Sequence, residues 1–218
     1  MALDHLVIRT PQRQRLLNDL ADRFNLQTLQ GFKSQAVILS EGVRFRNGPF
    51  IDVFDWPPEK AAFNPLIAIE GNIARVQQIA GKNGLNFRVH RREEIPADHR
   101  PPWSTLSFAR GQGLISSIFI IEYEAAPEAG AHDHFNGSLY DRSGLSLGDA
   151  ELCRIDVNCA DLHNAQLQLD AVVATPMPLL NLQADGTRPE GVGAIHIRPK
   201  DGPVLPWLSS DFDSVAGA

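Results

Sequence analysis

The stretch Ala2-Leu3-Asp4-His5-Leu6-Val7-Ile8-Arg9-Thr10-Pro11 decides the fold, because it predicts a strand that leads directly into a helix. Side chains of a strand point alternately to its two faces, so His5 shares one face with Val7 and Arg9. Thr10 is a good helix N-cap, and Pro11 suits the first helical position. A histidine held on a rigid strand can bind a metal or move a proton, which makes His5 the first candidate site residue.

Residues 1–58 predict one folding unit made of a strand, a helix and three further strands. The helix carries apolar residues at helical spacing and is followed by strands at 35–40, 43–46 and 50–56. Asn47-Gly48, between the last two strands, is typical of a tight hairpin turn.

One face of the strand 50–56 combines aromatic residues with a single acid. The residues on this face are Phe50, Asp52, Phe54 and Trp56. A carboxyl group among aromatic rings has either a partner or a raised pKa, so Asp52 is a candidate catalytic residue. The alternative is an ordinary cross-strand partner for Asp52, namely Arg44 or Arg46.

Residues 63–125 repeat the order of the first unit. A strand at 66–70 is followed by a helix that Asn83-Gly84 ends, and then by strands at 86–92, 103–109 and 114–123. Aligning 50–54 with 120–124 places Glu122 at the position of Asp52. The chain therefore contains an internal repeat that is matched in element order.

The remaining chain predicts a partial third copy at 149–200, after a long polar loop at 125–148. His132 and His134 lie in this loop, where they are either surface residues or a source of a further metal ligand. Cys153 and Cys159 fall in one predicted strand, roughly 20 Å apart and therefore beyond disulfide reach. From 206 on we expect a loose tail in which Trp207 docks on an apolar surface.

The composition favours a small-molecule protein. The chain has 218 residues, 43% of them hydrophobic, and a formal net charge of -6, which argues against a nucleic-acid partner. No apolar run approaches the roughly 20 residues of a membrane span, and the start of the chain has no signal-peptide pattern. We therefore expect no membrane partner and a cytoplasmic location.

The order of these elements resembles the vicinal oxygen chelate superfamily, and within it the glyoxalase-like domain family. The resemblance rests on the segments 3–8, 50–53 and 113–123, and on the stretch that holds Arg91, Arg92, Pro96, Asp98 and Trp103. It implies an α+β fold in which paired βαβββ modules form a curled mixed sheet around a pocket, with a partial third βαβ-type repeat at the C-terminus. It also implies a homodimer.

The resemblance further implies a divalent metal (Mn, Fe, Ni, Zn or Co) held by the first and last strands of each module. His5, Asp52 and Glu122 occupy three of the four ligand positions. Leu66 occupies the fourth, and a leucine does not bind a metal, so all three remaining ligands are needed.

Two functions are consistent with this reading. The first is a metal-dependent lyase, isomerase or dioxygenase acting on a substrate with neighbouring oxygens, in which Glu122 or Asp52 moves the proton. The second is a metal-free, drug-sequestering type of binding protein with an aromatic pocket. A third possibility is an interaction module with a vestigial pocket. The candidate substrate-binding residues are Phe50, Phe54, Trp56, Arg92, Trp103 and Tyr123.

Overall fold

The structure is a computed structural model, and it describes residues 1–34, 37–57, 63–96, 100–123, 138–140, 148–173, 176–185, 188 and 190–208. Within this part, no helix is long and apolar enough to cross a bilayer.

The first module has the predicted order of strand, helix and strands. Its elements are β1 (Ala2–Thr10), α1 (Arg13–Phe24), β2 (Leu29–Gln30), the small hairpin β3 (Lys33–Ser34) and β4 (Val37–Ile38), β5 (Ser40–Arg44) and β6 (Phe50–Asp55). β1 pairs in parallel with β6, and β5 joins β6 through a turn in which Gly48 has a φ of 107°. The helix begins two residues later than predicted, with Gln12 as its N-cap residue.

The second module repeats this arrangement. Its elements are β7 (Phe63–Glu70), α2 (Ile73–Lys82), β8 (Phe87–His90), the 3-10 turn η1 (Arg92–Glu94), β9 (Trp103–Phe108), the 3-10 turn η3 (Gly113–Ser117) and β10 (Ile118–Tyr123). β7 pairs in parallel with β10, as β1 does with β6. The Asn72 side chain caps α2 by accepting a hydrogen bond from the backbone N–H of Arg75 at 2.8 Å.

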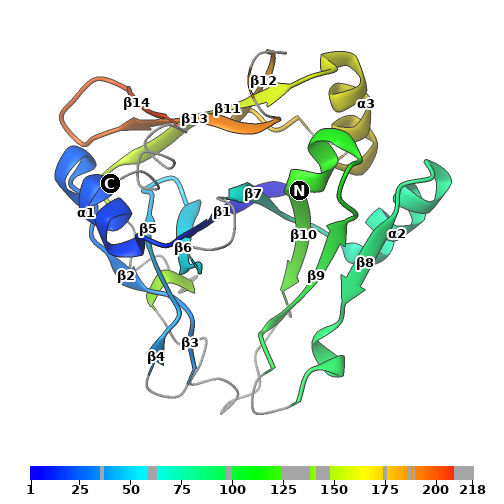
Figure 1. Cartoon of the computed structure of the whole chain (residues 1–218), viewed down its shortest axis with the longest axis horizontal. Helices are drawn as coiled ribbons and strands as arrows, with labels where there is room; N and C mark the ends of the chain where they lie inside the picture. Colours follow the sequence, from blue (N-terminus) through cyan, green and yellow to red (C-terminus); the bar gives the residue numbers. More distant parts are fainter. Residues whose placement is uncertain are drawn as a thin grey trace.

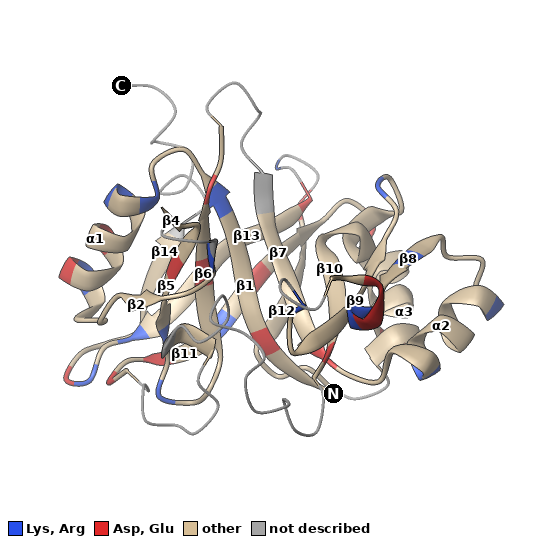
Figure 2. Cartoon of the chain, turned by 90° about the horizontal axis from the view of Figure 1, so that it is seen from below, with Lys and Arg blue, Asp and Glu red and all other residues tan. Residues whose placement is uncertain are grey.

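The two modules join through an antiparallel pairing of their first strands, β1 and β7. The result is one eight-stranded sheet in the order β2-β5-β6-β1-β7-β10-β9-β8. Figure 2 shows β6, β1, β7 and β10 side by side in the middle of this sheet. Figure 1 shows the sheet bent like an arch, with α1 on one flank and α2 on the other. The curled sheet of paired modules is thus confirmed.

A third unit covers the closed side of the arch (Figure 1). It consists of β11 (Glu151–Cys159), α3 (Leu162–Val173), β12 (Leu180–Ala184), β13 (Gly191–Arg198) and β14 (Leu205–Leu208). These strands form a sheet in the order β12-β11-β13-β14. The expected loose tail instead supplies β14, where Trp207 is fully buried and donates from Nε1 to Asp19 Oδ2 at 2.8 Å. Cys153 and Cys159 lie in β11 as free thiols.

The two faces of the eight-stranded sheet have different partners. The apolar face of β1, with Leu6 and Ile8, belongs to the same core as Ile155 and Trp207 of the third unit. The opposite face of β1 carries His5 and lines the inside of the arch. The third unit therefore buries the back of the sheet and leaves its concave face for a ligand.

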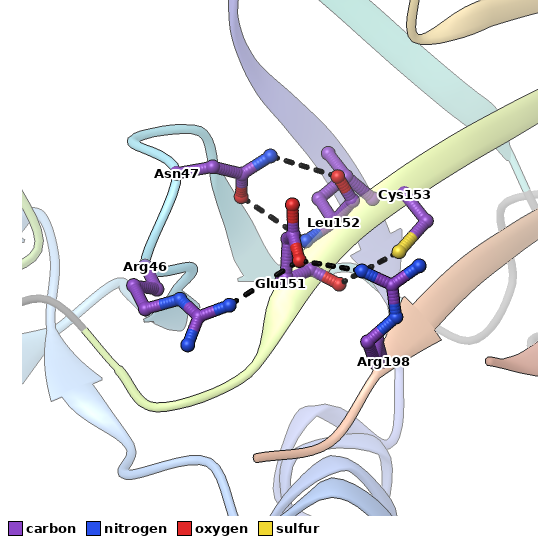
Figure 3. A network of polar contacts seen from close by, with 6 residues as sticks. All are labelled: Arg46, Asn47, Glu151, Leu152, Cys153 and Arg198. Carbon is purple, nitrogen blue, oxygen red and sulfur yellow. Dashed lines mark hydrogen bonds and ion pairs between the residues drawn. The ribbon is translucent and has the colours of Figure 1, made fainter. Parts of the chain in front are cut away.

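Side-chain contacts at the β5–β6 turn attach the first module to β11 (Figure 3). Asn47 donates from Nδ2 to the carbonyl oxygen of Leu152 at 2.8 Å and accepts from the Leu152 N–H at 3.1 Å. Beside this pair, Glu151 accepts from both Arg46 and Arg198. The side chain of Asn47 thus makes two hydrogen bonds with the backbone of Leu152, as a neighbouring strand would.

Candidate functional site

The concave face holds a cavity of about 400 Å³ between the two modules. The first module contributes His5, Val7, Arg9, Phe32, Asp52 and Phe54 to its walls. The second contributes Leu66, Trp103, Phe119, Ile121 and Tyr123, among others, and Tyr140 from the 3-10 turn η4 (Ser138–Tyr140) completes the lining. A cavity of this size lies within the range typical of small-molecule sites.

His5 is fixed from several sides. Its ring stacks on Phe50 at a centroid distance of 4.5 Å and meets the edge of Phe119 at 5.6 Å. The pairing of β1 with β7 shifts register between Leu3 and His5, as at a β-bulge, and Asp4 lies at that shift. Asp4 Oδ2 lies 2.6 Å from Nδ1 of His5. This contact leaves Nε2 of His5 as the ring nitrogen for a ligand in the cavity.

Asp4 also connects His5 to Tyr123, whose hydroxyl donates to Asp4 Oδ2 at 2.9 Å. Tyr123 lines the cavity. His5, Asp4 and Tyr123 therefore form a hydrogen-bonded chain at one end of the site, in which the carboxylate orients the imidazole.

Asp52 is the buried acid of the cavity, with 2% of its surface exposed. Tyr140 donates to its Oδ2 at 2.7 Å, while within the described residues Oδ1 is buried without a hydrogen-bond partner. Burial raises the pKa of Asp52, and this outweighs the opposing effects of the Tyr140 hydrogen bond and the nearby His5. Burial and the adjacent Asp52 likewise raise the pKa of Tyr140, so its phenol keeps its proton. Asp52 is thus biased toward the neutral carboxylic acid.

The backbone also approaches this acid closely at Gly31. A Cβ there would lie 3.2 Å from Asp52 Oδ1 and 2.4 Å from the hydroxyl oxygen of Ser40. Ser40 in turn accepts from the N–H of Phe32, a cavity residue. A glycine at 31 therefore lets the loop pack against the acid.

Aromatic rings make up much of the wall. Trp103 lies 5.3 Å from the ring centroid of Tyr140 and 5.8 Å from that of Tyr123. Phe54 and Phe119 line the cavity as well. This wall favours a flat, apolar ligand body.

The structure separates the predicted substrate-binding residues into two groups. Phe54, Trp103 and Tyr123 line the cavity. Phe50 supports His5 from behind, and Trp56 lies under the guanidinium of Arg9 at 5.0 Å rather than in the wall. Arg92 is outside the cavity: it is buried in η1, and its Nε donates to the Pro101 carbonyl at 3.1 Å.

Glu122 does not join His5 and Asp52, which corrects the expected three-ligand set. Its Oε1 accepts from Nδ2 of Asn72, the N-cap residue of α2, at 2.7 Å. The β10 residues that line the cavity are Phe119, Ile121 and Tyr123. Because strand side chains alternate, Glu122 points to the opposite face.

The described residues do not fit a divalent metal. They contain no group of three or more His, Cys, Asp or Glu side chains that could hold one, whereas catalytic metal sites usually have three protein ligands. The second module contributes Leu66, Phe119 and Ile121 to the cavity, and these side chains do not coordinate metals. His132 and His134 lie outside the described residues.

Tyr140 and Arg9, which line the cavity, and Asp4, which contacts His5, were not anticipated as site residues from the sequence. Tyr140 stands in a three-residue turn within the predicted loop, where no periodicity points to it. Asp4 contacts His5 at a register shift in the pairing of β1 with β7, which strand alternation does not predict. Arg9 did have a signal, since it shares the His5 face of β1.

No protein-family model and no curated protein matches this sequence. Solved structures do match it, and one is BphC, a halotolerant catechol dioxygenase, with 13% identity and a TM-score of 0.54. That alignment covers 90% of this chain and 69% of BphC. The chain has the vicinal oxygen chelate fold.

Two other matching structures have lower TM-scores of 0.47. A hypothetical protein from Staphylococcus aureus is 10% identical, over 95% of this chain and 85% of its own. The 2,3-dioxygenase LapB from Pseudomonas sp. KL28 is 11% identical, over 93% of this chain and 72% of its own. At these identities the likeness, including that to BphC, concerns the fold alone.

Proposed function

We propose that the protein is a small-molecule enzyme of the lyase or isomerase type, which moves a proton on a substrate that carries a carbonyl oxygen. The observation that carries this proposal is the pairing of two different proton-handling groups in one cavity. Asp52 is a buried acid with a raised pKa, and His5 is an imidazole oriented by Asp4. Enzymes use such pairs as general acid and general base.

The step we propose uses only these side chains. Nε2 of His5 removes a proton from a carbon beside the carbonyl, and Asp52 donates its proton to the carbonyl oxygen, which gives an enol. Return of the proton from His5 to the same carbon, with return of the enol proton to Asp52, regenerates the substrate with its proton exchanged. When that carbon also bears a hydroxyl group the intermediate is an enediol, and transfer of this hydroxyl proton to Asp52 together with proton transfer from His5 to the former carbonyl carbon completes an isomerisation. The largely aromatic wall strengthens the hydrogen bonds of His5 and Asp52 to the substrate.

The resemblance to the superfamily also implied a divalent metal and, as one alternative, a dioxygenase reaction. We favour the acid–base route because the described cavity offers an acid and a base but only two ligand-type side chains, His5 and Asp52. The proposed substrate is a small molecule, and membership of the glyoxalase-like family and a homodimeric state remain part of the proposal.

The experiment is proton exchange in D2O. The full chain is incubated with a panel of small aromatic ketones and hydroxyketones, and loss of the proton beside the carbonyl is followed by NMR. We expect exchange with at least one compound, reduced roughly 10²–10⁴-fold in Asp52→Asn and in His5→Gln. His163→Gln, exposed on α3, is the matched control and should keep the wild-type rate.

A binding protein without catalysis is the second candidate, and the Trp103–Tyr140–Tyr123 cluster favours it. It predicts calorimetric binding of the same compounds with no exchange by the wild type. Elemental analysis of the purified protein for Mn, Fe, Ni, Zn and Co accompanies the test. A stoichiometric metal that is lost in His5→Ala would overturn the metal-independent route.

A further inference from the structure

Arg44 is a buried arginine beside the site, with 7% of its surface exposed. In the pairing of β5 with β6 it lies opposite Phe50, so it is not the cross-strand partner of Asp52. Its guanidinium carbon lies 5.4 Å from the ring centroid of Phe50. Phe50 is in turn opposite His5 in the pairing of β6 with β1, and it stacks on the imidazole. Arg44, Phe50 and His5 therefore form one row across β5, β6 and β1, with Phe50 in the middle.

The guanidinium of Arg44 binds two backbone carbonyl groups. Its Nη1 donates to the carbonyl oxygen of Leu139 in η4 at 3.1 Å, and its Nη2 donates to that of Gly48 at 3.4 Å. Leu139 is fully buried and belongs to the same apolar cluster as Phe50. A Cβ on Gly42 would lie 2.8 Å from Cδ2 of Leu139, so a glycine at this position of β5 leaves room for the leucine. Leu139 is thus held against β5 both by its side chain and through its backbone.

Tyr140 follows Leu139 directly, and its hydroxyl donates to Oδ2 of Asp52 at 2.7 Å. Its ring meets that of Phe50 edge-on at a centroid distance of 5.9 Å. The carbonyl oxygen that accepts from Arg44 belongs to the planar peptide group that joins Leu139 to Tyr140. The position of this group fixes where the tyrosine side chain starts. A guanidinium, whose donors lie in one plane at fixed angles, holds such a group more precisely than an ammonium would.

We propose that Arg44 is a positioning residue of the site: by binding the peptide group before Tyr140, it places the tyrosine hydroxyl on Asp52. The inference rests on the proposed function, in which Asp52 is the general acid. Because Tyr140 donates to Oδ2, the proton of the neutral acid resides on Oδ1. Loss of the tyrosine bond lets the carboxyl group rotate and its proton turn away from the substrate. Arg44 thus acts on the reaction through Tyr140, without contact to the substrate.

The pKa of Asp52 shows whether Tyr140 is in place. Burial raises this pKa, and the hydrogen bond from Tyr140 is the largest of the effects that lower it. The charges of His5 on β1 and Arg13 on α1 lower it as well. Loss of the tyrosine bond should therefore raise the pKa of Asp52 further. Since Arg44 binds the peptide group before Tyr140, its replacement should have the same effect.

The test follows the carboxyl carbon of Asp52 in the full chain by NMR of 13C-labelled aspartate as a function of pH, with Asp52→Asn to assign the signal. We expect the pKa of Asp52 to rise in Tyr140→Phe and in Arg44→Met. It should rise no further in the double variant, because both changes remove the same hydrogen bond. Proton exchange of ketones in D2O should fall roughly 10–10²-fold in Arg44→Met. Arg46→Met, at a largely exposed arginine of the adjacent turn, is the matched control and should keep the wild-type pKa and exchange rate.

An unchanged pKa of Asp52 in Arg44→Met would overturn the inference, and so would effects of Arg44→Met and Tyr140→Phe that add in full. An undiminished exchange rate in Arg44→Met would overturn it too. If circular dichroism shows that Arg44→Met does not fold, Arg44→Lys keeps the buried charge without the planar fork. The pKa of Asp52 should still rise in that variant, and an unchanged value there would refute the inference. Absence of exchange by the wild type would refute the proposed function alone, because the titration of Asp52 needs no substrate.

Discussion

The hydroxyl of Tyr140 lies 2.7 Å from Oδ2 of Asp52, although 88 residues separate the two in the chain. Tyr140 is the donor, because burial and the neighbouring acid raise its pKa. This bond is one of the interactions that hold the pKa of Asp52 down against the larger effect of burial. Tyr140 therefore helps to set the proton affinity of the acid in the cavity.

Replacing Tyr140 by Phe should destabilise the protein by about 1–3 kcal/mol at neutral pH, because a buried carboxyl oxygen loses its donor. It should also raise the pKa of Asp52 further. Urea unfolding monitored by circular dichroism gives the first quantity. Tyr123→Phe is the control, since its hydroxyl bonds Asp4 and not Asp52. Equal effects of the two variants on the pH dependence of stability would contradict this role of Tyr140.

The stability of the protein should depend on the ionisation of Asp52. Because its pKa is raised in the folded state, Asp52 stabilises the fold fully below the ordinary pKa of an Asp, and this contribution is lost as pH rises through the raised value. The free energy of unfolding of wild type, relative to Asp52→Asn, should fall across this window. The fall is about 1.4 kcal/mol for each tenfold difference in proton affinity between the folded and unfolded chains. A difference that is independent of pH between 3 and about 8 would rule the effect out.

The sequence predicted which acid and which histidine the first module contributes to the site. Alternation in β1 and β6 places His5 and Asp52 on the concave face, and the Asn47-Gly48 turn is where it was expected. These features are local, so a single strand or turn is enough to reveal them.

What the sequence did not predict depends on register and on distant contacts. Neighbouring hydrophobic residues aligned Glu122 with Asp52, but Glu122 lies between two cavity residues of β10, Ile121 and Tyr123, and adjacent positions of a strand face opposite ways. The contact of Tyr140 with Asp52 and the position of Asp4 at a register shift have no local pattern.

Changing Glu122 to Gln should therefore leave proton exchange, aromatic ligand binding and metal content as in the wild type. The side chain is on the face of β10 away from the cavity, where a glutamine still accepts the hydrogen bond from Asn72. NMR exchange in D2O and elemental analysis check this, with Asp52→Asn in parallel as the variant that should lose exchange. A loss of activity or metal in Glu122→Gln that equals the loss in Asp52→Asn would show that Glu122 does belong to the site.

Asn47 attaches the third unit to the first module through the backbone of Leu152. Asn47→Ala removes both hydrogen bonds to the backbone of Leu152, so we expect a loss of about 1–3 kcal/mol in urea unfolding. Asn47 does not have a positive φ, so alanine adds no strain to the turn. Arg46→Ala, which breaks only a largely exposed ion pair with Glu151 beside it, should cost about 0–1 kcal/mol. Equal losses for the two variants would show that the pairing of Asn47 with β11 does not hold the units together, whereas the expected difference would make that pairing a principal polar contact between them.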